Sequence, residues 1–294
     1  MLEVISFSNK MKEIIPEGFQ FNKLATGFGW SEGPIWEAKT KSVYFTDFTK
    51  EEVYKWNSKE GLTIHRGESG CACGLAFDGE GRILSAESKT RSLRRQEKDK
   101  SLTTLALSYE GKRLNSPNDL IVKSDGSIYF TDPHSVDTGN IKELSSNGVY
   151  KIDPKTGKLM LLGVFNRPNG LAFSMDEKLL YIDDTNLQTV YVYKVKEDGT
   201  IHAGKVFAKL DVKAGQGAAD GMKVDSKGNI YITGPGGISI YSPKGERLGL
   251  LKTPETAANL CFGGEDLKTL YITATTSLYS LTVGISGIAT NFEK

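Results

Sequence analysis

The sequence predicts an all-β protein, a six-bladed β-propeller. Two observations predict this fold: a strand and turn unit that recurs six times, and an alternating run of β-branched and aromatic residues inside each unit. The units repeat at intervals of roughly 38 to 51 residues, which is typical of propeller blades rather than of helical repeats. One unit is therefore expected to form one blade, and residues 1–294 are expected to form a single propeller domain.

Each unit begins with a turn that enters a short apolar strand. The six entries are Ser31-Glu32-Gly33-Pro34, Cys73-Gly74-Leu75, Pro117-Asn118-Asp119-Leu120, Pro168-Asn169-Gly170-Leu171, Ala219-Asp220-Gly221-Met222 and Ala258-Asn259-Leu260. A second strand follows at residues 42–47, 82–87, 127–132, 179–184, 229–233 and 270–273. The alternation of apolar and polar residues predicts that these second strands are half-buried. A third strand follows in most units, and little of the chain is left for helix.

The N-terminal stretch is expected to complete the last blade. The sixth unit contains only two or three clear strands, whereas residues 18–26, ahead of the first unit, have the composition of a strand. Pairing this strand with the last blade would cover an exposed sheet edge. We therefore expect the ring to be closed by the strand at about residues 18–26.

Composition narrows the class of function. The formal net charge is +1, with acidic and basic residues interspersed, so nucleic acid and anionic membranes are not expected partners. No apolar run approaches the ~20 residues of a membrane-spanning helix, and residues 1–3 lack the pattern of a signal peptide. Three cysteines are a sparse, odd set. We expect a cytoplasmic protein that is a monomer or a small homo-oligomer.

Polar residues at the entry turns form the candidate site. In a propeller the innermost strands all start at the same end of the central channel, so their first residues should converge there. These residues are Glu32, Cys73, Asn118 with Asp119, Asn169, Asp220 and Asn259, with no Lys or Arg among them. Unpaired carboxylates that face one another repel and shift their pKa values unless a cation neutralises them, and oxygen ligands favour Ca²⁺, Mg²⁺ or Mn²⁺. Taken singly, Asn and Asp are also ordinary turn residues, but together the four residues Glu32, Asn118, Asn169 and Asp220 predict a central metal site.

These motifs resemble those of the senescence marker protein 30/gluconolactonase family, especially its bacterial branch. The resemblance is carried by Ser31-Glu32-Gly33-Pro34-Ile35-Trp36, Ser116-Pro117-Asn118-Asp119, Arg167-Pro168-Asn169-Gly170 and Ala219-Asp220-Gly221-Met222, in order and spacing. It implies one divalent cation, Ca²⁺ or alternatively Mg²⁺, Mn²⁺ or Zn²⁺, held by Glu32, Asn169 and Asp220 with Asn118 nearby. It further implies hydrolysis of a sugar lactone or related cyclic ester, with Asp220 as the base, Asp119 as a second carboxylate and Asn118 in contact with substrate.

Two departures from the family pattern concern the substrate. The animal members of the family have an Arg that can hold the sugar at the position of Ser116. The bacterial branch has Ser at this position, as this chain does. His134 follows Thr131-Asp132-Pro133 where the bacterial motif continues with a second Pro. His134 is therefore a candidate proton donor or substrate contact at the channel mouth, and the loops at residues 137–146 and 211–219 are candidate lids.

Other functions remain open at this stage. The same metal residues would suit a phosphotriesterase-like hydrolase, and propellers also serve as non-catalytic binding scaffolds. A scaffold would have no need of unpaired carboxylates on its axis, so the four entry residues favour an enzyme. Asp47, Asp132 and Asp184, which each end a second strand, are expected to be structural and to bond backbone amides between blades.

Overall fold

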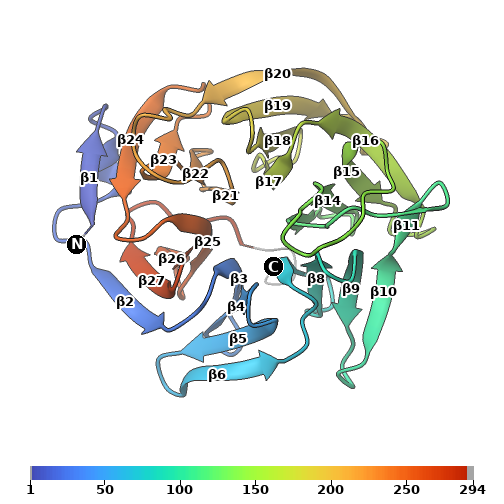
Figure 1. Cartoon of the computed structure of the whole chain (residues 1–294). Helices are drawn as coiled ribbons and strands as arrows, with labels where there is room; N and C mark the ends of the chain where they lie inside the picture. Colours follow the sequence, from blue (N-terminus) through green and yellow to red (C-terminus); the bar gives the residue numbers. More distant parts are fainter. Residues whose placement is uncertain (1, 290–294) are drawn as a thin grey trace.

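The structure, a computed structural model, describes residues 2–289 and consists of β-sheets arranged around a central channel (Figure 1). Six of the sheets in this part of the chain are blades, and in each the strand that begins the unit lies innermost. The first three blades are β3 (Ser31–Glu37), β4 (Ser42–Asp47), β5 (Glu52–Asn57) and β6 (Gly61–Arg66); β7 (Ala72–Phe77), β8 (Ile83–Glu87), β9 (Ser92–Gln96) and β10 (Leu102–Ala106); and β13 (Leu120–Val122), β14 (Ile128–Asp132), β15 (Asn147–Ile152) and β16 (Leu159–Phe165).

The other three blades follow in chain order. They are β17 (Pro168–Phe173), β18 (Leu179–Asp184), β19 (Thr189–Val195) and β20 (Ile201–Lys209); β21 (Met222–Val224), β22 (Ile230–Gly234), β23 (Gly237–Tyr241) and β24 (Arg247–Lys252); and β25 (Ala257–Gly263), β26 (Thr269–Ala274) and β27 (Ser277–Thr282). A separate hairpin of β11 (Ser108–Tyr109) and β12 (Lys112–Arg113) links the second and third blades. The six-bladed fold predicted from the repeats is confirmed.

The N-terminal segment adds outer strands to two blades. β2 (Phe21–Thr26) runs antiparallel to β27, with Phe21 opposite Leu281 and Thr26 opposite Ser277. This strand lies within the residues expected to pair with the last blade. β1 (Glu3–Ser6) pairs with β24 and makes the fifth blade five-stranded, which the repeat pattern did not predict. The short helix α1 (Met11–Ile14) lies between these two strands in the sequence, and Met11 and Ile14 are buried against the last two blades.

The second strands are more deeply buried than expected. Every residue of β4, β8, β14 and β22 is buried, including polar residues such as Ser42 and Thr46. The expectation of half-buried strands was wrong because each blade is packed on both faces by its neighbours, so neither face of a second strand meets water. The cores lie between adjacent blades, and aromatic pairs such as Phe45 with Tyr54 and Phe130 with Tyr150 contribute to them.

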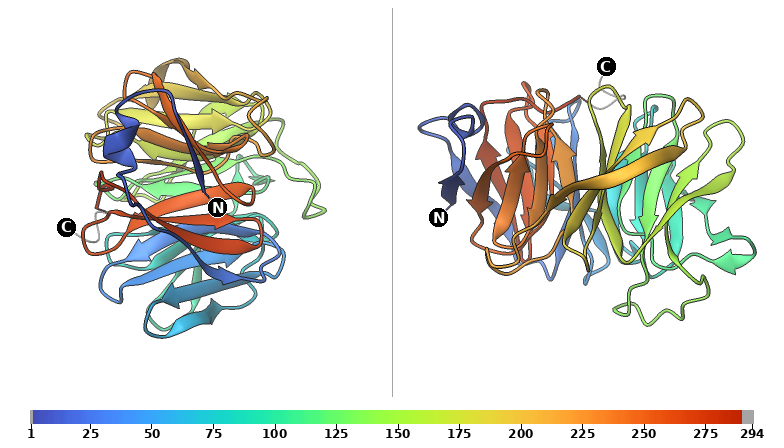
Figure 2. Two further views of the ribbon diagram at one scale, coloured as in Figure 1. Left: turned by 90° about the vertical axis from the view of Figure 1, so that its left-hand side faces the viewer. Right: turned by 90° about the horizontal axis from the view of Figure 1, so that it is seen from above.

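The two ends of the channel differ. The inner strands all start at the same end of the channel, and the loop that follows β14 projects from this face (Figure 2). The last described residues of the chain lie on the opposite face, where Gly287 pairs with Asp225. We call the first the entry face and the second the exit face. Within residues 2–289, no helix is long and apolar enough to span a bilayer.

Candidate active site in the channel

Three buried aspartates hold the segments that carry the entry residues. The carboxylate of Asp47 accepts the backbone N–H groups of Gly29 (2.8 Å) and Trp30 (3.2 Å), immediately before Glu32. The equivalent residue Asp132 accepts the N–H of Asn115 (2.8 Å). Burial raises the pKa of Asp132 to about 7, against the N–H groups of Asn115 and Ser116. Hydrogen bonds to such a buried carboxyl group orient a loop that has no sheet partner of its own. The predicted bonds to backbone amides are present in both blades, although these amides lie in the segment that enters the inner strand of the same blade rather than in a neighbouring blade.

Asp184 repeats this arrangement in the fourth blade. It accepts the N–H groups of Asn166 (2.7 Å) and Arg167 (3.2 Å), just before Asn169. Three of the four expected ligands are thus carried by segments that a buried carboxylate fixes from the end of the neighbouring strand.

The entry turns pack tightly around the channel. A glycine follows the entry residue in four blades, and a β-carbon at each would clash with the next blade. Such an atom on Gly33 would lie 2.0 Å from the carbonyl oxygen of Cys73, and one on Gly170 would lie 2.1 Å from the carbonyl oxygen of Asp220. The same holds for Gly74 against Asp119 and for Gly221 against Asn259. The width of the ring at this level is therefore set by backbone contacts between blades.

Aligning the six inner strands places the polar groups in two layers. The residue that follows each entry turn serves as a common reference; these residues are Pro34, Leu75, Leu120, Leu171, Met222 and Leu260. The first layer lies two residues before this reference and contains Glu32, Asn118, Asn169 and Asp220. Asp119 and Asn259 occupy the next position, where the other four blades have glycine. The sequence had grouped Asn259 with the first layer; Ala258 holds that position, so Asn259 belongs to the second.

Glu32 is buried and weakly paired. Its Oε2 accepts the N–H of Gly33 (3.0 Å) and the side-chain N–H of Asn259 (3.4 Å), and its Oε1 accepts the indole N–H of Trp30 (3.4 Å). Burial, followed by repulsion from Asp119, raises the pKa of Glu32 to about 7, although these hydrogen bonds act in the opposite direction. The group therefore resists ionisation unless a positive charge is added nearby.

The pKa values of two neighbouring carboxyl groups, Asp220 and Asp119, are also raised. Burial, followed by repulsion from Glu32 and then from Asp183 and Asp119, raises the pKa of Asp220 well above its ordinary value, and a hydrogen bond from Asn169 opposes this. Burial also raises the pKa of Asp119, against the charge of Lys223 and the N–H groups of Leu120 and Asn259. The structure thus brings Glu32, Asp119 and Asp220 close enough for their charges to interact.

Sequence reasoning missed Asp183. This residue is fully buried next to the channel, accepts the N–H of Gly170 (3.3 Å), and leaves its Oδ2 without a hydrogen-bond partner among the described residues. Burial raises its pKa well above the ordinary value. The signal was present in the repeats, because four other blades have Thr at this place and three of these, Thr46, Thr131 and Thr233, bond the entry backbone of the next blade.

Sequence reasoning also missed Lys223. No entry residue is basic, as expected, but the Nζ of Lys223 approaches the second layer from below and donates to the carbonyl oxygen of Met222 (3.0 Å) and to the Oδ1 of Asn259 (3.4 Å). The absence of Lys and Arg among the entry residues therefore does not leave the acidic cluster without a positive neighbour. An Lys on the inner strand, three residues after Asp220, was the available signal.

His134 lies in the loop on the entry face. Its Nε2 is 3.1 Å from the carbonyl oxygen of Asn140, and its backbone N–H donates to Asn147 (3.1 Å). Asn140 in turn donates to the carbonyl oxygen of Ser88 (2.8 Å), and Glu143 forms an ion pair with Arg91 (2.9 Å). The imidazole is thus part of the contacts that fasten this loop over the second blade.

The first and second layers fit a hard cation. The side-chain oxygens Asn169 Oδ1 and Asp119 Oδ2 are buried and have no hydrogen-bond partner among the described residues. Within residues 2–289, no three His, Cys, Asp or Glu side chains are grouped as a metal site on their own, so an ion would also need the amide oxygens. Unsatisfied buried oxygens and carboxylates that resist ionisation are what a divalent cation would relieve.

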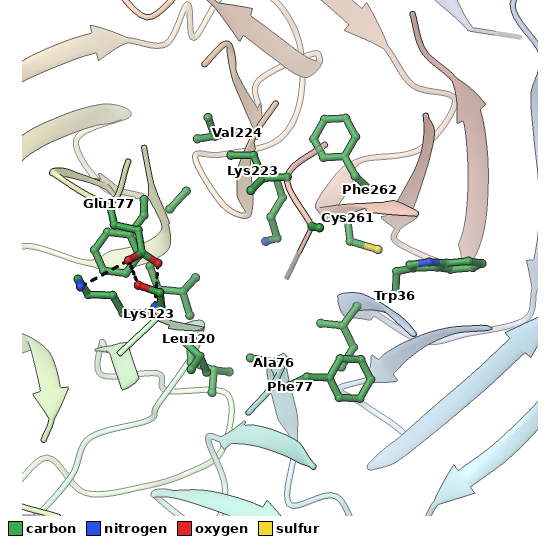
Figure 3. Close-up of a pocket in the computed structure, with 18 of the residues that line it drawn as sticks. Trp36, Ala76, Phe77, Leu120, Lys123, Glu177, Lys223, Val224, Cys261 and Phe262 are labelled. Atoms are coloured by element: carbon green, nitrogen blue, oxygen red, sulfur yellow. Dashed lines mark hydrogen bonds and ion pairs between the residues drawn. The ribbon is translucent and has the colours of Figure 1, made fainter. Parts of the chain in front are cut away.

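On the exit face the channel opens into a largely apolar cavity of about 410 Å³ (Figure 3). Its walls include Trp36, Phe77, Leu120 and Phe262, and Lys223 points into it from the fifth blade. The polar layers and this cavity therefore lie at successive depths along the same inner strands.

Comparison with known proteins shows where the chain belongs. It is 32% identical to a gluconolactonase of Zymomonas mobilis, over 92% of this chain and 83% of that protein, and 28% identical to the pentonolactonase XacC of Haloferax volcanii, over 82% and 80%. A gluconolactonase structure from Xanthomonas campestris superimposes with a TM-score of 0.88 at 28% identity, covering 95% of this chain and 94% of that one. Residues 30–276 match the SMP-30/Gluconolactonase/LRE-like region. The chain is a member of the SMP-30/gluconolactonase family.

Proposed function

We propose that this protein is a divalent-cation-dependent hydrolase that opens a sugar lactone or related cyclic ester. The observation that carries the proposal is the first layer, in which Glu32 is buried, the charges of Glu32 and Asp220 interact, and both have raised pKa values beside the unpaired oxygen of Asn169. The gluconolactonase and pentonolactonase among the relatives support the reaction class. A binding scaffold would not explain this arrangement.

The cation would be held by Glu32, Asn169 and Asp220, with Asn118 at its edge. All four offer oxygen atoms, which favours Ca²⁺, and then Mg²⁺ or Mn²⁺, over ions that prefer sulfur. When bound, the cation supplies Lewis-acid polarisation of the carbonyl group and charge to balance the oxyanion. Asn118 is partly exposed, unlike Asn169, and is therefore available to a substrate hydroxyl.

Asp220 acts as the base. It is less completely buried than Asp119, so an entering water molecule can reach it. The attacking water transfers a proton to the Asp220 carboxylate as its oxygen bonds to the carbonyl carbon. The ring C–O bond then breaks, and the departing oxygen takes this proton to give the hydroxy acid. Asp119, beneath the site, contributes negative charge that favours proton acceptance.

His134 and the loop that carries it form the substrate side of the site. The loop is fastened at Ser88 and Arg91 and lies on the entry face, where a lactone would arrive. The Nε2 of His134 must exchange its contact with Asn140 for one with a substrate if the imidazole is to donate a proton. Ser116, which accepts the N–H of Ser135 (3.3 Å), ties the same loop to the third blade and leaves no guanidinium for the sugar.

The test is lactone hydrolysis followed by a pH indicator. A panel with glucono-δ-lactone, pentonolactones and aliphatic γ-lactones is measured before and after chelation, then with Ca²⁺, Mg²⁺, Mn²⁺ and Zn²⁺ restored singly. We expect activity to require a cation, and Asp220→Asn to lower kcat by roughly 10²- to 10⁴-fold, the usual contribution of a general base. Asp99→Asn, at an exposed hairpin turn, is the matched control.

Metal content is measured on the same samples by elemental analysis. Full activity and unchanged metal content in both Glu32→Gln and Asp220→Asn would refute the site. Activity on phosphotriesters but on no lactone would replace the proposed reaction by the phosphotriesterase-like one on the same residues.

A further inference from the structure

Lys223 is the one charged residue in a ring of six equivalent positions. Each inner strand places a residue just below the second polar layer, and all six of these residues line the exit cavity: Ile35, Ala76, Ile121, Ala172, Lys223 and Cys261. The first four and the last are apolar or weakly polar. A lysine in such a ring loses hydration of its ammonium group, so a local partner must compensate for it.

One of the two hydrogen-bond partners of Lys223 belongs to the second layer, and the other is the backbone of the preceding residue. Its Nζ donates to the carbonyl oxygen of Met222 (3.0 Å) and to the Oδ1 of Asn259 (3.4 Å), and Figure 3 shows the side chain directed into the channel. Its charge also acts on Asp119, whose pKa it lowers against the effect of burial. The ammonium group thus interacts with Asn259 and Asp119 from the side of the second layer that faces the exit cavity.

The atoms around this ammonium group would also suit a metal ion. Asp119 Oδ2 is buried without a hydrogen-bond partner among residues 2–289, and Asn259 Oδ1 and Met222 O are neutral oxygen acceptors. Carboxylate, amide and carbonyl oxygens are the ligands of hard cations. The amide of Asn259 also donates to Glu32 Oε2 (3.4 Å), so this set adjoins the first layer directly.

We propose that the ammonium group of Lys223 takes the place of a second cation beneath the first layer and so restricts the channel to one divalent ion. This inference rests on the proposed function, because it presumes that the first layer binds an ion. Lys223 neutralises part of the charge of Asp119 and repels a further cation at short range. Without it, the unpaired Oδ2 of Asp119 would lie beside the Oδ1 of Asn259, which keeps only the N–H of Leu260 (2.9 Å), next to the first layer.

The experiment is a count of bound ions. Wild-type protein and the variant Lys223→Met are stripped with chelator, dialysed against Ca²⁺ or Mn²⁺, and analysed for metal per chain. Met is close to Lys in length and suits a ring whose other members are largely apolar. We expect about one ion per chain in the wild type and about two in Lys223→Met, since an uncompensated buried carboxylate next to neutral oxygens favours a hard cation.

Two further variants separate charge from packing. Lys223→Arg keeps the charge and should stay at about one ion, whereas Lys223→Met combined with Asp119→Asn removes the second carboxylate and should return to about one ion. Lys223→Gln provides the same test should Lys223→Met not fold. One ion in both the wild type and Lys223→Met would overturn the inference and leave the proposed function intact. No bound ion in the wild type would overturn both.

Discussion

Replacing Glu32 by Gln should stabilise the metal-free protein at neutral and alkaline pH. The pKa of Glu32 is raised to about 7 from an ordinary value of 4.5, chiefly by burial. The folded chain therefore binds this proton more tightly than the unfolded chain does. The resulting stability is fully present below about pH 4.5 and is lost as the pH rises to about 7, which at about 1.4 kcal/mol per pKa unit amounts to roughly 3 kcal/mol.

The measurement is urea denaturation in the presence of chelator at pH 5 and pH 8. The wild type should lose stability between the two, and Glu32→Gln should lose less by up to roughly 3 kcal/mol, because the amide cannot ionise and also ceases to repel Asp220. Glu17→Gln, at an exposed position, is the control. Equal losses of stability in the wild type and Glu32→Gln would refute the burial and repulsion assigned to this carboxylate.

Three other outcomes follow from the fold. Gly170→Ala should lower stability by about 1–3 kcal/mol or more, because its β-carbon would lie 2.1 Å from a backbone oxygen, whereas Gly79→Ala, which meets nothing within 4 Å, should have little effect; thermal denaturation distinguishes them. Arg66→Met should cost about 1.5–3 kcal/mol, the value of a hydrogen bond to a charged group, because the buried Glu87 keeps its second ion pair with Arg94 (3.4 Å). Lys41→Met, which breaks an exposed ion pair, should cost less than about 1 kcal/mol, and similar losses in urea denaturation would contradict the burial difference. Removing residues 1–27 should leave the sixth blade with three strands and the edge of β27 exposed, and so cause aggregation visible by light scattering. Removing only residues 1–7 should not, because the fifth blade then keeps four strands, as the other blades have.

The fold was predictable because its evidence is periodic. Six similar units each contribute an entry turn and a Tyr-rich second strand, and this spacing alone indicates the ring. The first polar layer followed from the same alignment, since Glu32, Asn169 and Asp220 all occupy one position of the repeat. Polar residues that recur at one position of an otherwise apolar repeat indicate a shared site.

The remaining features depend on depth in the channel rather than on sequence spacing. Lys223 belongs to the site because its long side chain reaches back to Asn259, a contact that no motif records. Asp183 lies on a second strand, where the pattern indicated a structural role. β1 joined the fifth blade although its sequence follows no repeat, because the edge of β24 was open to pairing.

The tight packing of the entry turns has a consequence for variants that lack a ligand. Gly33 and Gly170 already touch the next blade through backbone atoms, so the ring cannot contract to fill the space left by a truncated side chain. A change such as Glu32→Gly should leave a lasting vacancy with the dimensions of a small carboxylate. Formate or acetate supplied in solution would then occupy that space and replace the missing carboxylate of Glu32.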